Sequence, residues 1–133
     1  MSVVTHLNPP SLPASPAFSQ AVKVATPATL VFIGGQNGVD TSGQPVSDQA
    51  GEQCAQALRN VEAAVQAAGG TIADIVKWTI TVTDRSVIGP GFGAFQQLWG
   101  QRPNPPAISV QIVTGLGNPD FLVEIEAVAA LSD

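Results

Sequence analysis

A long amphipathic helix followed directly by an alternating strand is the feature that most constrains the fold. Over residues 47–68 the apolar positions recur every three or four residues, as on a helix with one buried face, at Cys54, Leu58, Val61, Val65 and Ala68. Ser47 is expected to cap the start of this helix, and Gly69 and Gly70 to end it. Over residues 75–83 apolar and polar residues alternate, which predicts a strand with one buried face. The helix is therefore expected to pack on a sheet that contains this strand.

Four further strands and a second helix are expected around this unit. Residues 19–24 and 29–33 are predicted to pair as a β-hairpin, and residues 107–113 and 121–131 to form two later strands. A short helix is predicted over residues 90–100 from the helical spacing of Phe92, Phe95, Leu98 and Trp99. The order β-β-α-β-α-β-β predicts an α+β fold in which two helices pack on one face of a mixed sheet.

The 133 residues are predicted to form a single domain, 1–133, with residues 1–17 as a proline-rich, irregular N-terminal arm. Only 11% of the residues are charged, against about 25% in an ordinary soluble domain. Because so few charges cover a monomer poorly, the sheet face without helices is expected to meet other copies of the chain. The N-terminus lacks the pattern of a signal peptide and no apolar stretch approaches ~20 residues, so a cytoplasmic location is predicted.

Charge and composition exclude several functional classes. The net charge is −5 and the five basic residues are scattered, which argues against nucleic-acid binding. With one cysteine and one histidine, no metal site is expected. Cys54 lies on the apolar stripe of the helix and is interpreted as a core residue rather than a nucleophile. His6 lies in the arm, so histidine-assisted serine or cysteine catalysis is not expected.

Two local features leave alternatives open. Glu124 and Glu126 lie two apart in a predicted strand, so they point the same way, ~6–7 Å apart. They are either an acid–base pair or solvated charges that meet a basic residue across an interface. Gly34 and Gly35 follow the strand at 29–33 and mark either a bulge or strand end, or a backbone amide presented to a ligand.

Several separated strings resemble the Rid (YjgF) family of reactive-intermediate deaminases. They are FSQAVKV, LVFIGGQ, QALRNVEAAVQAAGG with DIVKWTITVTD, and PPAISVQIVTGLG with VEIEAVA, in order over about residues 17–130. The resemblance implies a chorismate-mutase-like fold and a homotrimer with ligand clefts between neighbouring subunits. It also implies hydrolysis of enamines and imines, such as 2-aminoacrylate, to a ketoacid and ammonia, with neither a metal nor an organic cofactor.

The resemblance implies a site that differs from that of the family deaminases at four positions. The arginine of the family string P-A-R-S, which grips the substrate carboxylate, is Ile108 in this chain, and the cysteine two positions later is Val110. The usual asparagine of the second helix is Phe92, and a usual tyrosine is Phe18. Two family features are kept. They are Gly35, whose backbone contacts the ligand, and Glu124, which helps to position the hydrolytic water.

These replacements predict a largely apolar ligand pocket. The resemblance therefore implies a divergent hydrolase of an imine, an enamine or a similar reactive metabolite that lacks a simple carboxylate. The alternative is a non-catalytic trimeric module that binds a small apolar ligand or a partner protein. An endoribonuclease activity, ascribed to some relatives, is disfavoured by the acidic charge. Arg102, in the loop before Ile108, is a candidate replacement for the missing cation.

Overall fold

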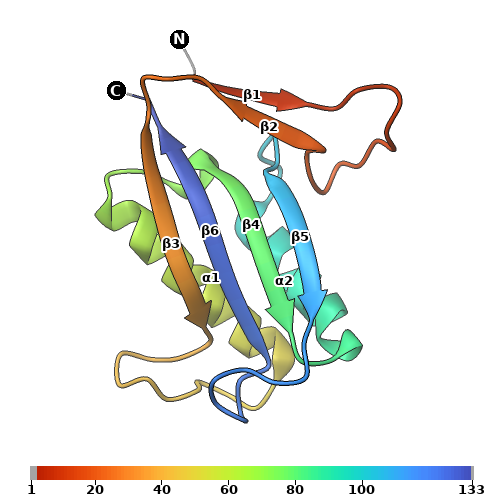
Figure 1. Ribbon diagram of the computed structural model, residues 1–133. Helices are drawn as coiled ribbons and strands as arrows, with labels where there is room; N and C mark the ends of the chain where they lie inside the picture. The colour runs from red at the N-terminus through yellow and green to blue at the C-terminus, as the bar shows by residue number, and fades with distance from the viewer. Residues whose placement is uncertain (1–2, 133) are drawn as a thin grey trace.

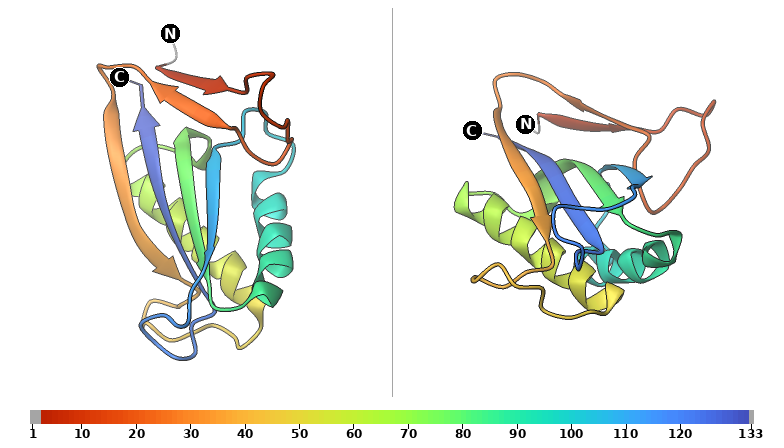
Figure 2. Two further views of the ribbon diagram at one scale, coloured as in Figure 1. Left: turned by 45° about the vertical axis from the view of Figure 1, so that its right-hand side comes forward. Right: turned by 60° about the horizontal axis from the view of Figure 1, so that its bottom comes forward.

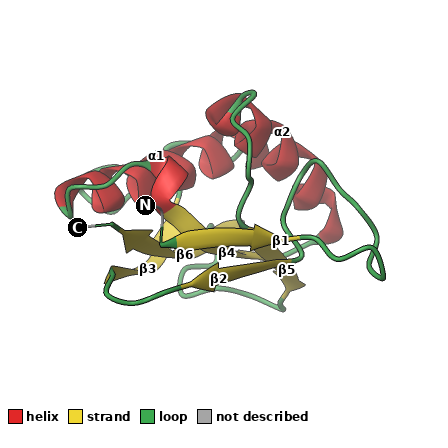
Figure 3. Ribbon diagram, turned by 90° about the horizontal axis from the view of Figure 1, so that it is seen from above, coloured by secondary structure: helices red, strands yellow, loops and turns green. Residues whose placement is uncertain are grey.

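The computed structural model describes residues 3–132 and has two layers, a four-stranded sheet and two helices that cover one of its faces (Figures 1 and 3). The strand order is β3-β6-β4-β5, in which β6 is antiparallel to both neighbours and β4 is parallel to β5. The elements of these layers are β3 (Thr29–Asn37), α1 (Ala50–Ala67), β4 (Ile75–Val82), α2 (Ile88–Trp99), β5 (Ala107–Ile112) and β6 (Val123–Leu131). The predicted α+β fold with two helices on one face of a mixed sheet is confirmed.

The two short 3-10 helices, η1 (Ile72–Asp74) and η2 (Arg85–Val87), lead into β4 and α2 respectively. The helices α1 and α2 lie side by side on the same face of the sheet, α1 over β3 and β6 and α2 towards β5 (Figure 2). Because a parallel pair of strands needs a crossover connection, α2 links β4 to β5 across this face. β5 is thereby left as an edge strand with α2 beside it.

The N-terminal segment differs from the prediction. Within the arm expected to be irregular, β1 (Val4–Leu7) forms a strand and pairs antiparallel with β2 (Ala21–Val24). The expected hairpin between residues 19–24 and 29–33 is therefore wrong, because β2 pairs with β1, and β3 pairs with β6 instead. The alternation that identifies a strand does not identify its partner, and here the partner of β3 comes almost a hundred residues later.

The main helix ends where the glycine pair predicted and begins slightly later than expected. Gly69 has a positive φ of 89°, and the amides of Gly69 and Gly70 donate to the carbonyls of Gln66 and Val65. At the other end the N-cap is Gln49, without a side-chain cap, and the Ser47 hydroxyl instead accepts from the Gln49 amide. The predicted Ser47 cap is therefore wrong, and Ser47 closes the turn before the helix.

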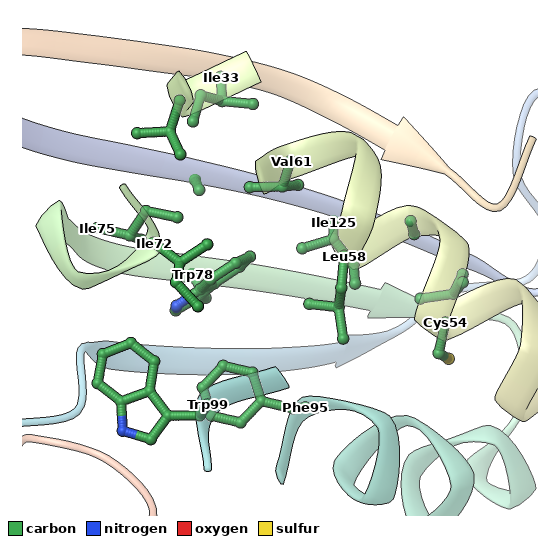
Figure 4. Packing of buried hydrophobic residues seen from close by; sticks show 14 of the residues in the cluster. Ile33, Cys54, Leu58, Val61, Ile72, Ile75, Trp78, Phe95, Trp99 and Ile125 are labelled. Atoms are coloured by element: carbon green, nitrogen blue, oxygen red, sulfur yellow. The ribbon is translucent and has the colours of Figure 1, made fainter. Parts of the chain in front are cut away.

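Aromatic side chains fix α2 against the sheet (Figure 4). The ring of Phe95 packs edge-on against the buried Trp78 of β4, with centroids 5.7 Å apart, and stacks on Trp99, with centroids 6.0 Å apart. Such pairs contribute about 0.5–1.5 kcal/mol each beyond the area that they bury. This packing holds one side of α2 against the sheet, while Phe92 on another side of the helix stays 44% exposed.

A buried amide holds together the loops that lead into α1 and β6. The Gln53 side chain donates to the carbonyls of Ser47 and Asp120 and accepts from the amide of Leu122. Gln53 is 1% exposed, so these bonds satisfy a group whose burial is otherwise costly. They fix the chain immediately before Glu124.

The second sheet face carries no helix, and we call it the open face (Figure 3). It presents Leu30, Phe32 and Val128 beside a polar strip from β4, β5 and β6, in which the Lys77 ammonium donates to the Ser109 hydroxyl at 2.6 Å. Phe32 is 76% exposed and Leu30 49%. Neighbouring exposed apolar side chains of this kind are typical of interaction surfaces.

No helix among residues 3–132 is both long and apolar enough to cross a membrane.

Candidate functional site

An apolar cleft of about 260 Å³ lies between α2 and the edge strand β5. Ile108 and Val110 pair with Trp78 and Ile80 of β4, so their side chains point to the helix-covered face. Ile108 is partly buried against the core, whereas Val110 is 49% exposed. Phe92 of α2 closes the opposite wall.

Phe18 completes this wall because the next residue, Ser19, is hydrogen-bonded to the loop before β5. The Ser19 amide donates to the Pro106 carbonyl at 3.0 Å, and its hydroxyl donates to the Pro105 carbonyl. The same hydroxyl lies 3.0 Å from Nδ1 of His6, so β1 braces this connection. Ser19 is 2% exposed and acts as a structural clamp rather than as a nucleophile.

The structure thus brings together four of the six residues that the sequence singled out: Phe18, Phe92, Ile108 and Val110. Sequence reasoning missed the rest of the lining, chiefly Ile80, Val82 and Ile88. The alternation of β4 placed Ile80 and Val82 on the buried face, and with Val82 1% exposed and Ile80 partly buried they form the base of the cleft.

Glu124 and Gly35 form a second group, on the open face. Glu124 alternates with the buried Val123 and Ile125, so its side chain points away from the helices. Gly35 lies in a bulge between β3 and β6, and a Cβ added to it would come within 2.6 Å of Cδ of Glu124. The Gly34-Gly35 step is therefore a bulge where the Glu124 carboxylate passes close to the backbone. Within one chain, this pair and the cleft lie on opposite faces of the sheet.

Arg102 does not line the cleft. Its guanidinium donates to the carbonyls of Leu98 and Trp99 at 2.9 and 2.8 Å and lies 5.9 Å from the centre of the Trp99 ring. A cation is favourable there because carbonyls at the end of a helix carry partial negative charge. Arg102 thus caps α2 instead of replacing the missing cation, and the lining of the cleft contains no charged residue.

Cys54 is a buried core residue between the two helices. Cys54 is 1% exposed, and a Cβ on Gly91 would lie 3.3 Å from its sulfur. Burial raises the pKa of the Cys54 thiol to about 11. At neutral pH it is therefore not a thiolate nucleophile.

The described chain offers no grouping of three or more His, Cys, Asp or Glu side chains that could hold a metal ion.

Comparisons with known proteins match this chain to one protein family over most of its length. A family model described as Endoribonuclease L-PSP matches residues 10–131. The chain is 35% identical over 115 residues to a human 2-iminobutanoate/2-iminopropanoate deaminase, covering 84% of this chain and 78% of that protein. It is 31% identical over 113 residues to a RutC family protein of Pyrococcus horikoshii, covering 84% and 85%.

Solved structures show the same architecture. A Rid family protein of unknown function from Yersinia pestis, YyfB, superposes with a TM-score of 0.85 at 29% identity, over 97% of this chain and 99% of that one. E. coli TdcF, solved with bound serine, superposes with a TM-score of 0.72 at 30% identity, over 90% and 91% of the two chains.

Proposed function

The chain belongs to the Rid (YjgF) family, and from this premise we propose that it hydrolyses imines or enamines that carry an apolar group and no carboxylate. The observation that carries the proposal is the apolar cleft at Ile108. The relatives named as deaminases act on 2-iminobutanoate and 2-iminopropanoate, which both bear a carboxylate. A buried carboxylate without a hydrogen-bonding partner is strongly disfavoured, so this cleft selects against such substrates.

Catalysis in this proposal requires a second subunit, which the homotrimer implied by the family resemblance would supply. Glu124 points away from the cleft of its own subunit, and β4 separates its strand from β5. One chain therefore cannot direct both groups at one substrate. When the open face packs against a neighbouring subunit, that neighbour's cleft receives the Gly35 and Glu124 pair. Each of the three sites then combines residues of two subunits.

The reaction uses water and no cofactor. The carboxylate of Glu124 accepts a proton from water as the water oxygen bonds to the imine carbon. The electron pair of the C=N bond moves to nitrogen, which takes up a proton to give a carbinolamine. Nitrogen then gains a second proton while the hydroxyl loses one, the C–N bond breaks, and a carbonyl product and ammonia leave. The apolar wall of the cleft holds the apolar group of the substrate, so that this group does not block the attacking water.

Glu124→Gln is expected to lower the hydrolysis rate on the order of 100-fold, because an amide holds water but cannot accept its proton. The substrate is the imine of phenylacetaldehyde, generated by an amine oxidase, and hydrolysis is followed by competition with semicarbazide trapping. Glu126→Gln is the matched control, two residues along the same face of β6, and is expected to retain activity. Equal rates in the wild type and Glu124→Gln, or no acceleration by the wild type, would contradict the proposal.

Gly35→Ala is expected to lower activity while leaving the fold intact. The new methyl group meets the end of the flexible Glu124 side chain, not backbone, so the carboxylate moves aside and the sheet is preserved. Gly34→Ala is the control, because a Cβ there meets nothing within 4 Å. We expect a loss of at least about tenfold in kcat for Gly35→Ala alone, with urea midpoints of the two variants alike. Retention of full activity in Gly35→Ala would show that the position of Glu124 is not important.

The alternative, a non-catalytic module that binds an apolar ligand, predicts ligand binding without turnover in the same assay. Endoribonuclease activity is not proposed, although the family model carries that description, because a net charge of −5 repels the phosphate backbone.

A further inference from the structure

A second hollow of about 250 Å³ adjoins the apolar cleft, beside the C-terminal half of α2. Ala17, Phe92 and Phe95 line both hollows, so the two share a common boundary. Phe95 is buried against Trp78 and Trp99, whereas Phe92 is 44% exposed. The two hollows are therefore two compartments of one groove along α2, and Phe92 is the exposed part of the boundary between them.

The compartments differ in chemistry. The inner compartment, the cleft at Ile108, has an apolar lining, whereas the outer one includes the exposed side-chain amide of Gln96. Other donors of the outer compartment are already used: the Trp99 indole N–H donates to the Arg102 carbonyl at 2.8 Å, and the Gly100 amide to the Gln96 carbonyl at 2.8 Å. The Gln96 amide is thus the side chain there that can bond an uncharged polar group.

The volumes indicate the size of the ligand. An enclosed apolar cavity of roughly 150 Å³ holds benzene, so the inner compartment, at about 260 Å³, holds a phenyl ring with a short chain. If the imine carbon is placed at the β5 end of the cleft, beside Ile108 and Val110, the remainder of a longer molecule extends past Phe92 towards Gln96.

We infer that the outer compartment is a second subsite, which binds an uncharged polar group at the far end of an extended aromatic substrate through Gln96. This inference rests on the proposed function for the orientation of the substrate. Phe92 separates the two subsites and determines how long a substrate the groove accepts. The substrate class is then a phenylalkyl imine or enamine with an amide or hydroxyl at its far end.

Binding of unreactive phenylalkyl amides tests the second subsite independently of turnover. Phenylacetamide, 3-phenylpropanamide and 5-phenylpentanamide are titrated calorimetrically into the wild-type protein, Gln96→Ala and Gln97→Ala. Gln97 is the matched control, since it is also exposed but lines neither compartment. Gln96→Ala is expected to weaken 5-phenylpentanamide about fivefold, through one lost hydrogen bond, and phenylacetamide not at all. Gln97→Ala is expected to change neither.

For each amide, the Kd of the variant is compared with the Kd of the wild type. The affinity that each added methylene contributes is the same in both and therefore cancels. An equal effect of Gln96→Ala at every chain length, an effect as large in Gln97→Ala, or no binding of any amide would overturn the second subsite. If the length-dependent effect is found but no imine is hydrolysed, the subsite stands and the proposed reaction fails. If imines are hydrolysed without that effect, the reaction stands and the subsite fails.

Discussion

Phe32→Asp is expected to dissociate the proposed homotrimer into monomers and to abolish the proposed hydrolysis. Phe32 is 76% exposed on the open face, next to Leu30 and across from Val128. Burying a phenylalanine side chain is worth about 1.5–3 kcal/mol, and three copies contribute in a trimer. Aspartate removes this contribution and places an unpaired carboxylate in the interface. Because each proposed site needs two subunits, activity is lost together with assembly. Sedimentation velocity at micromolar concentration measures the change.

Leu12→Asp is the control for this substitution. Leu12 is a large apolar residue that is 46% exposed, but it lies in the loop between β1 and β2 and not on the open face. The Leu12→Asp protein is expected to keep the assembly and the activity of the wild type. A wild-type monomer, or a Phe32→Asp protein that still sediments as a trimer, would show that the open face is not the subunit interface.

Ile108→Arg is expected to reverse the substrate preference. The guanidinium would enter the apolar cleft and offer a paired hydrogen bond to a substrate carboxylate, worth about 1.5–3 kcal/mol. That corresponds to a gain of about 10- to 100-fold in kcat/KM for carboxylate-bearing imines. Imines without a carboxylate leave the new charge unpaired and are expected to lose activity by a similar factor. The preference therefore changes by about 10²- to 10⁴-fold, measured with matched imines of phenylacetaldehyde and phenylpyruvate.

Ile108→Met separates the effect of charge from that of shape. Methionine has a similar volume and fills the same wall without a charge, so the wild-type preference is expected to remain. The same change of preference in Ile108→Met, or none in Ile108→Arg, would show that the lost cation does not determine selectivity.

The sequence was most informative where periodicity is long and one face is buried. The stripe from Cys54 to Val65 and the alternation in β4 predicted α1, β4 and the packing of α1 on the sheet that contains β4. Strand pairing was less predictable, because adjacency along the chain suggested a hairpin while β3 pairs with the distant β6. β1 was missed because it spans four residues, Val4–Leu7, beside a proline-rich loop.

For the candidate site too, strand alternation predicted which residues share a face but not how the faces are arranged in the fold. Alternation in β6 predicted that Glu124 and Glu126 share a face, and it gave Ile108 and Val110 a common face in β5. Which of these faces the helices cover depends on how the whole sheet is assembled. The family resemblance implied clefts between subunits, but only the three-dimensional arrangement placed Glu124 and the cleft on opposite faces of one chain's sheet. The role of Arg102 as a cap of α2 was equally beyond periodicity, since it depends on where the loop after α2 turns.

The selectivity of the wild-type protein is the most direct test of a hydrolase built on an apolar cleft. Two imines that differ only in the carboxylate are compared: the phenylacetaldehyde imine from phenethylamine and the phenylpyruvate imine from phenylalanine. We predict that kcat/KM is at least about tenfold higher for the imine without the carboxylate, because the cleft leaves a carboxylate unpaired. Faster hydrolysis of the phenylpyruvate imine, or acceleration of neither, would contradict this function.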